Sequence, residues 1–98
     1  MTAVGILALA LAGGATTAFA FKGQEYAKEA NVTLVQARAI ALKAVPGKIT
    51  DEELEKEGGG SGLRYSFDIK TDGPTHEVGV DAKTGKLLEN SIEGPHSD

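Results

Sequence analysis

Residues 63–86, LRYSFDIKTDGPTHEVGVDAKTGK, contain two alternating segments separated by a turn. In the first segment large apolar side chains alternate with polar ones, which is the pattern of a strand with one buried face; its apolar residues are Leu63, Tyr65, Phe67 and Ile69. The second segment alternates in the same way from His76 to Ala82. Because Thr71-Asp72-Gly73-Pro74 between them has turn composition, we predict an antiparallel hairpin.

A second turn follows the hairpin at residues 81–85. Aspartate in such a turn accepts hydrogen bonds from nearby backbone, and glycine adopts the left-handed conformation. We therefore predict a structural role for Asp81, Thr84 and Gly85 instead of a catalytic aspartate loop. Residues 86–88 lead into a short final segment, so we expect about three strands in the sheet.

A helix is predicted before the hairpin, from Leu34 to about Ala44. Thr33 and Gln36 have the spacing of a capping box at its start, and Pro46-Gly47 ends it. One face of this helix is apolar and rich in alanine, which allows close packing on a sheet. Arg38 and Lys43 lie off that face, and we expect both to point to water.

Residues 49–57 give conflicting signals. Asp51-Glu52-Glu53-Leu54-Glu55-Lys56-Glu57 is rich in helix formers, and local propensity alone predicts a helix. As a strand the segment alternates poorly, since only Ile49 and Leu54 are apolar. A flexible glycine-rich loop follows at residues 58–62 in either case.

The first twenty residues have the layout of a secretory signal. They carry no charge, contain an apolar run from Val4 to Ala12, and end in the small-residue pattern Ala18-Phe19-Ala20. We predict cleavage after Ala20, with a buried helix or an uncleaved anchor as alternatives; after cleavage no stable membrane span is expected. Residues 21–32 are then a linker with possible helical character, residues 33–92 the folded domain, and residues 93–98 a flexible tail.

Composition excludes several kinds of function. The 98 residues carry a formal net charge of −4, and every charged residue follows residue 20, so a mature form is not suited to hold nucleic acid or an anionic membrane by charge. There is no cysteine, which removes disulfides and thiolate sites. His76 and His96 do not form a ligand set, the acidic run lacks a calcium-loop pattern, and no Ser-His-Asp spacing is present. We expect neither an enzyme nor a cofactor.

The order of these segments resembles the PepSY family. The resemblance rests on the alanine-rich helix of residues 33–41, the Val45-Pro46-Gly47-Lys48-Ile49 stop, the strand 63–69, and the strand and turn 77–86. It covers about residues 33–90. The family implies a helix on an antiparallel sheet, with residues 49–57 as the first strand, and we adopt that strand because tertiary context overrides propensity. Members are exported or cell-envelope proteins, or parts of secreted metallopeptidase precursors in which the module restrains or chaperones the peptidase.

The sequence thus predicts an exported, non-catalytic α+β binding module. Its partner would be a protein, such as a peptidase, held at an exposed sheet edge or on the charged strand face. Arg64, Asp68 and Lys70 are the candidate partner-facing residues, and an ordinary solvated face is the alternative interpretation. A periplasmic small-ligand or metal-ion sensor is the alternative function, supported only by clustered carboxylates. The oligomeric state stays open.

Overall fold

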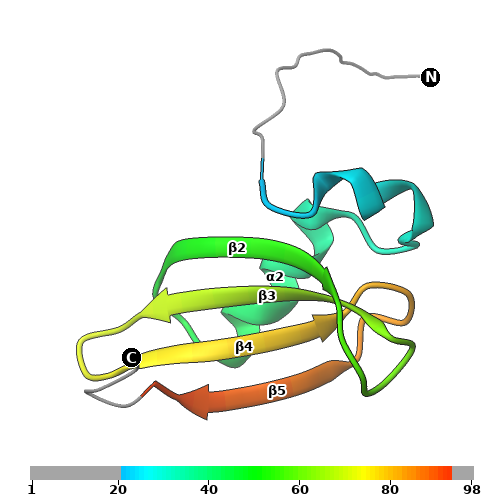
Figure 1. Ribbon diagram of the computed structural model, residues 1–98. Helices are drawn as coiled ribbons and strands as arrows, with labels where there is room; N and C mark the ends of the chain where they lie inside the picture. Colours follow the sequence, from blue (N-terminus) through cyan, green and yellow to red (C-terminus); the bar gives the residue numbers. More distant parts are fainter. Residues whose placement is uncertain (1–20, 94–98) are drawn as a thin grey trace, which may run out of the picture.

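The computed structural model describes residues 21–93, where one α-helix lies against one side of a four-stranded antiparallel sheet (Figure 1). The strands follow the chain order across the sheet: β2 (Lys48–Lys56), β3 (Leu63–Lys70), β4 (Thr75–Asp81) and β5 (Leu87–Ile92). The predicted α+β class with a single main helix is confirmed, and the sheet has four strands where about three were expected. The predicted signal peptide and residues 94–98 of the predicted tail lie outside the described residues.

The helix α2 (Leu34–Ala44) begins with the predicted capping box. Thr33 Oγ1 accepts a hydrogen bond from the Gln36 backbone N–H at 3.1 Å, and Gln36 Oε1 accepts one from the Thr33 N–H at 2.9 Å. Ala37 and Ala41 are completely buried against β3 and β4. Their small side chains let the helix backbone come close to the sheet, so the predicted alanine face is the packing face.

Strand β2 occupies the segment in which local propensity favoured a helix. Each of its residues from Asp51 to Lys56 pairs with one on β3, and Leu54, opposite Tyr65, is 1% exposed. Burying that leucine and completing the hydrogen bonds of β3 outweigh a helix preference that is below about 1 kcal/mol per residue. The pairing shifts between Ile49 and Asp51, so the strand is irregular at Thr50.

The core lies between α2 and the sheet and holds the apolar residues of the predicted hairpin. Tyr65 and Phe67 are nearly fully buried, with ring centroids 6.4 Å apart. The Tyr65 hydroxyl donates to the Val32 carbonyl at 2.7 Å, which satisfies the one polar atom of that ring. The remaining buried core residues are Ala37, Ala41, Val45, Leu54, Leu63, Ile69, Val78, Val80 and Ala82.

Residues 21–32, expected as a linker with possible helical character, contain a 3-10 helix, η2 (Gln24–Glu29), and are hydrogen-bonded to the domain near both ends. The Lys22 carbonyl accepts a hydrogen bond from the Leu54 N–H at 2.8 Å, and the Ala82 carbonyl accepts from both Asn31 and Val32 at 2.9 Å. Gly23 permits the first contact, since it has φ 86° and a Cβ there would lie 1.6 Å from the Leu54 carbonyl oxygen. This segment therefore closes one end of the β2 edge.

Candidate functional site

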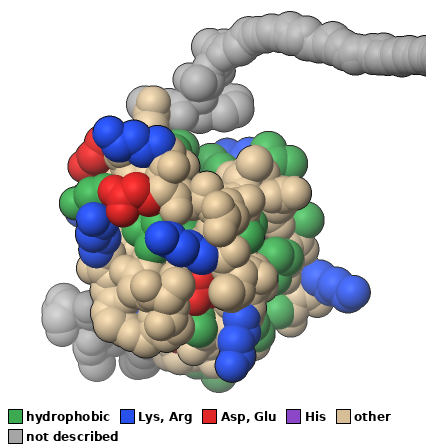
Figure 2. Space-filling view, turned by 90° about the vertical axis from the view of Figure 1, so that its right-hand side faces the viewer, with side chains coloured by type: hydrophobic (Ala, Val, Ile, Leu, Met, Phe, Trp, Pro, Cys, Tyr) green, Lys and Arg blue, Asp and Glu red, His purple; other side chains and the backbone are tan. Residues whose placement is uncertain are grey.

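The side of the sheet turned away from α2 faces the viewer in Figure 1, with α2 behind the strands. We call this surface the open face. Besides the buried Asp81, strand alternation and the pairing of the four strands place six carboxylates on it; they are Asp51, Glu53, Glu55, Asp68, Glu77 and Glu89. The end of the molecule shown in Figure 2 differs, because Lys and Arg side chains lie beside Asp and Glu side chains there. The open face is therefore a surface dominated by negative charge.

Three of these carboxylates form one row across the sheet. Asp51 on β2 pairs with Asp68 on β3, and Asp68 pairs with Glu77 on β4. Residues directly opposite each other on neighbouring strands lie about 4.5–5.5 Å apart at Cβ, where like charges repel. The row is thus a place where the fold holds negative charges together without a cation in the row itself.

The pKa values of the open face reflect this crowding. Burial raises the pKa of Asp68, and the charges of Glu93 and Asp51 raise it further. The pKa of Glu77 is raised in the same way, first by burial and then by Glu89 and its other acidic neighbours. A hydrogen bond with Glu55 raises the pKa of Glu53. A bound cationic group would relieve this repulsion and lower these pKa values.

Arg64, expected on an exposed charged face, lies instead beneath the surface of the open face. Its side chain is only 9% exposed, its Nη1 lies 3.3 Å from Glu89 Oε1, and its Nη2 donates to the Gly58 carbonyl at 3.1 Å. Gly79 makes room for it, because a Cβ there would stand 3.1 Å from Nη1. Within residues 21–93, the buried Nε of Arg64 has no hydrogen-bond partner. Arg64 therefore crosses β4 to fasten β5 to the 58–62 loop.

The other two predicted partner-facing residues have different positions. Asp68 is half-buried in the middle of the acidic row, whereas Lys70 is exposed at the end of β3. The structure thus does not bring Arg64, Asp68 and Lys70 together as one exposed group. Sequence reasoning did not single out Glu77 and Glu89 as members of the surface. The alternation of β4 identifies the face on which Glu77 lies, but no local signal reveals the register that places it beside Asp68.

Asp81 lies at the edge of the open face and organises two loops. It is 1% exposed, and its Oδ1 accepts hydrogen bonds from the backbone N–H groups of Lys83 and Thr84 at 2.8 and 3.2 Å. Both of its oxygens also bind Ser61 of the glycine-rich loop, at 2.7 Å each. Burial alone would raise the pKa of Asp81, but these donors lower it to about 2. Gly85 has φ 81°, and its N–H donates to the Asp81 carbonyl at 2.9 Å, which closes the turn.

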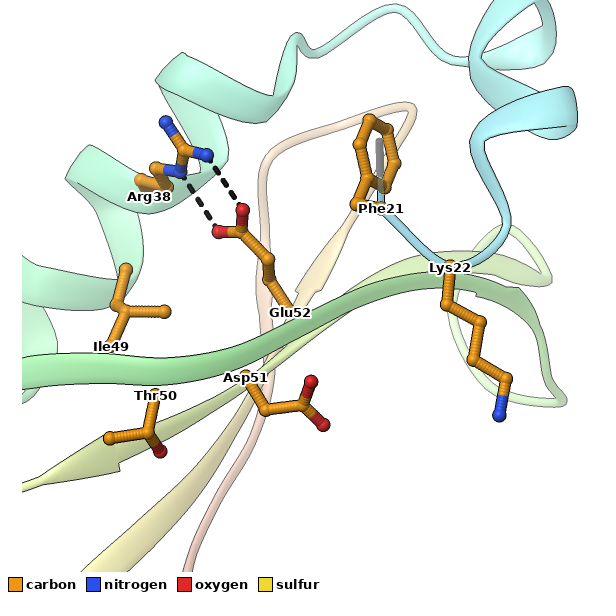
Figure 3. A pocket seen from close by; sticks show the side chains of 7 residues that line it. All are labelled: Phe21, Lys22, Arg38, Ile49, Thr50, Asp51 and Glu52. Atoms are coloured by element: carbon orange, nitrogen blue, oxygen red, sulfur yellow. Dashed lines mark hydrogen bonds and ion pairs between the residues drawn. The ribbon is translucent and has the colours of Figure 1, made fainter. Parts of the chain in front are cut away.

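An open groove of about 470 Å³ runs between α2 and the β2 edge, and Figure 3 shows its lining. Arg38 from α2 and Glu52 from β2 point toward each other across it and form a two-bond ion pair, at 2.9 Å from Nε and 2.6 Å from Nη2. The expectation that Arg38 points to water is therefore wrong. The hydrogen bond with Glu52 raises the pKa of Arg38. The ion pair holds the edge strand β2 to α2, so these two groove residues have a structural role.

No cluster of three or more His, Cys, Asp or Glu side chains in the described part of the chain has an arrangement that could hold a metal ion. Within residues 21–93, His76 Nδ1 lies 3.0 Å from Asn90 Oδ1, a hydrogen bond between neighbouring strands. The described helices include none long and apolar enough to cross a membrane.

Comparison with known proteins gives one match. The model of the PepSY family, described as peptidase propeptide and YPEB domain, matches residues 31–90. This range includes α2, all of β2 to β4 and most of β5. No curated protein and no solved structure matches the chain.

Proposed function

Because this chain belongs to the PepSY family, we propose that it is an exported, non-catalytic module that binds a protein partner, such as a peptidase, through the open face of its sheet. PepSY domains are generally non-catalytic modules like those of peptidase propeptides, and they typically occur in exported proteins. The open face supports this role because it is the broad side of the sheet that α2 does not cover.

The observation that carries the proposal is the crowded acidic row Asp51, Asp68 and Glu77. Such a row costs the free protein stability, since the charge of Asp51 helps to raise the pKa of Asp68, and the charge of Asp68 helps to raise that of Glu77. A partner surface rich in lysine and arginine would neutralise the row and gain electrostatic attraction during encounter. The proposed partner therefore presents a cationic surface, and its binding weakens as salt screens the charges.

The binding experiment is a pull-down of exported and envelope proteins with the purified chain, followed by activity assays on any peptidase retained. The informative variant is Asp68→Asn with Glu77→Gln, which removes two charges from the open face. The matched control is Glu25→Gln with Asp72→Asn, which removes two exposed charges elsewhere. We expect the first variant to lose at least about tenfold in affinity, equivalent to about 1.4 kcal/mol, and the control to bind normally.

The assays separate the possible consequences of binding. Loss of peptidase activity on adding the chain would support inhibition in trans, and unchanged activity would support a chaperone or scaffold role. Equal loss of binding in both variants would refute a role specific to the open face. Capture of no protein at micromolar bait would refute the stable-binder proposal itself.

The export part of the proposal has its own test. If the signal is cleaved after Ala20, the protein recovered outside the cytoplasm begins at Phe21, and intact-mass measurement would show this. A mass that includes residues 1–20 would refute cleavage and favour the anchor alternative.

A further inference from the structure

The two edges of the sheet are protected to different degrees. The β2 edge has an irregularity at Thr50, charged side chains along its length, and the Lys22 carbonyl bound to the Leu54 N–H. These are the devices by which proteins keep an edge strand from pairing with another chain. The edge at β2 is therefore already partly closed.

The β5 edge has far less protection. Its sequence, LLENSI, contains no proline or lysine and only one charge. Leu87 is 40% exposed and Ile92 is 62% exposed. Leu87 pairs with the core residue Val80, and Ile92 pairs with His76, which is itself opposite the core residue Ile69. Directly paired residues share a face, so both exposed side chains lie on the side that bears α2.

The helix leaves this flank uncovered, because α2 packs on β3 and β4. In Figure 1, β5 lies at the lower border of the sheet, away from β2. A strand added beside β5 would thus extend the sheet and also cover Leu87 and Ile92.

The backbone of β5 is oriented for such an addition. The N–H of Glu93 donates to the Thr75 carbonyl at 2.8 Å, so Glu93 points its backbone groups inward, toward β4. In an antiparallel ladder these groups alternate in direction. Asn90 and Ile92 therefore point their N–H and C=O groups outward.

We propose that β5 pairs with β5 of a second copy of this chain, antiparallel and about a two-fold axis at Asn90. In this arrangement Asn90 lies opposite Asn90 of the second copy and exchanges two backbone hydrogen bonds with it. Glu89 then lies opposite Ser91 of the second copy. The result is one continuous eight-stranded sheet formed by two four-stranded ones.

The irregularity within β5 is what makes the strand self-complementary. Pairing with β4 passes from Gly79–Glu89 to Val80–Leu87, so Leu88 is an extra residue. Leu87 and Ile92, five residues apart, consequently lie on the same face. When this irregularity is kept in both copies, Leu87 lies opposite Ile92 of the second copy, and the reverse pair forms at the other end. The two most exposed apolar side chains of β5 thus cover each other. Glu89 does not lie opposite Glu89 of the second copy, so the pairing brings no two identical charges face to face.

Charge opposes this association, and salt should strengthen it. Each copy carries a net charge of −4 and an acidic open face, and the pairing places the two faces side by side. Screening reduces that repulsion while leaving the backbone hydrogen bonds and apolar contacts intact. Salt therefore strengthens self-association but weakens binding of the proposed cationic partner. The two proposals can consequently fail separately.

The test uses the absence of cysteine from the chain. Hydrogen-bonded antiparallel pairs have Cα atoms about 5.5 Å apart, within the range that a disulfide spans. Asn90→Cys should form a covalent dimer at least about tenfold faster than Val35→Cys, because pairing raises the local concentration of its thiol. Val35 is the control, since it is 70% exposed but lies on the helix.

Sedimentation of the cysteine-free chain completes the test. We expect the dimer fraction to rise with protein concentration and with salt, and Ile92→Lys to abolish it while circular dichroism shows an unchanged fold. Equal cross-linking rates for the two cysteine variants would overturn the proposal. A wild-type chain that stays monomeric at every concentration would also overturn the proposal. This includes a chain whose β5 edge is taken by its own residues 94–98 or by a strand of another protein.

Discussion

Replacing Asp81 by asparagine should remove a single buried acceptor on which two loops depend. The carboxylate accepts hydrogen bonds from the backbone N–H groups of Ser61, Lys83 and Thr84 and from the Ser61 hydroxyl. Asparagine has one acceptor oxygen, and its NH₂ group would face a donor that then has no partner. Both the β2–β3 loop and the β4–β5 turn should loosen as a result.

The magnitude follows from the pKa of Asp81. The folded protein lowers it from an ordinary value of 3.8 to about 2, and at 1.36 kcal/mol per pKa unit this corresponds to about 2 kcal/mol of stability. Leaving a buried donor unsatisfied costs a similar amount, about 1–3 kcal/mol. Since 1 kcal/mol moves the melting temperature of a domain this size by about 4–8 °C, Asp81→Asn should melt about 10 °C lower at pH 7.

The effect of pH has a definite sign. Because the folded pKa is lower than the unfolded one, the contribution of ionised Asp81 is complete above pH 4 and disappears as the pH falls through about 2. The difference in the free energy of unfolding between wild type and Asp81→Asn should therefore shrink between pH 4 and pH 2. Urea unfolding followed by circular dichroism measures it, with the exposed Asp72→Asn as control. Equal stabilities at pH 7, or a difference that does not change with pH, would refute the reasoning.

Three further substitutions test other parts of the fold by urea unfolding. Thr33→Ala should lower the free energy of unfolding by about 1 kcal/mol, because it removes the helix cap. A decrease no larger than that caused by a substitution at an exposed helix position would contradict this role. Gly79→Ala should cost about 1–3 kcal/mol, because the new Cβ would stand 3.1 Å from Arg64 Nη1; an unchanged stability would show that Arg64 can move aside freely. Glu77→Gln should raise stability at pH 7 by a few tenths of a kcal/mol, since the raised pKa of Glu77 means that its ionised form is unfavourable in the folded protein. This gain should vanish as the pH falls toward 4. A loss of stability at pH 7 would contradict the repulsion.

Local signals predicted much of the fold correctly. The helix begins directly after its cap residue Thr33 and ends before Pro46, because the cap, the apolar periodicity and the proline all act within a few residues. The β3–β4 hairpin is evident from alternation and from the turn at residues 71–74. In each case the physical cause lies within the segment that it shapes.

The candidate surface was predicted less well. Asp68 belongs to the open face, but the side chain of Arg64 is buried where it passes over Gly79 of β4. The carboxylates beside Asp68 come from β2 and β4, not from its own strand. Its register with Asp51 and Glu77 depends on how three strands align. A single strand specifies which of its faces is polar, but not which charges of its neighbours lie beside that face.

The sequence by itself determined the apolar faces, the helix cap, the turn at Asp81 and the negative net charge, since each is a property of one short segment or of composition. Only the tertiary structure decided that Arg38 bonds Glu52 and that Arg64 is buried, and only it overrides the local helix preference of residues 48–56 in favour of the strand that the family resemblance implied. The reason is the same for all three. Their partners lie 6 to 25 residues away along the chain, and the energy of burying Leu54 or pairing a guanidinium exists only after distant segments have met.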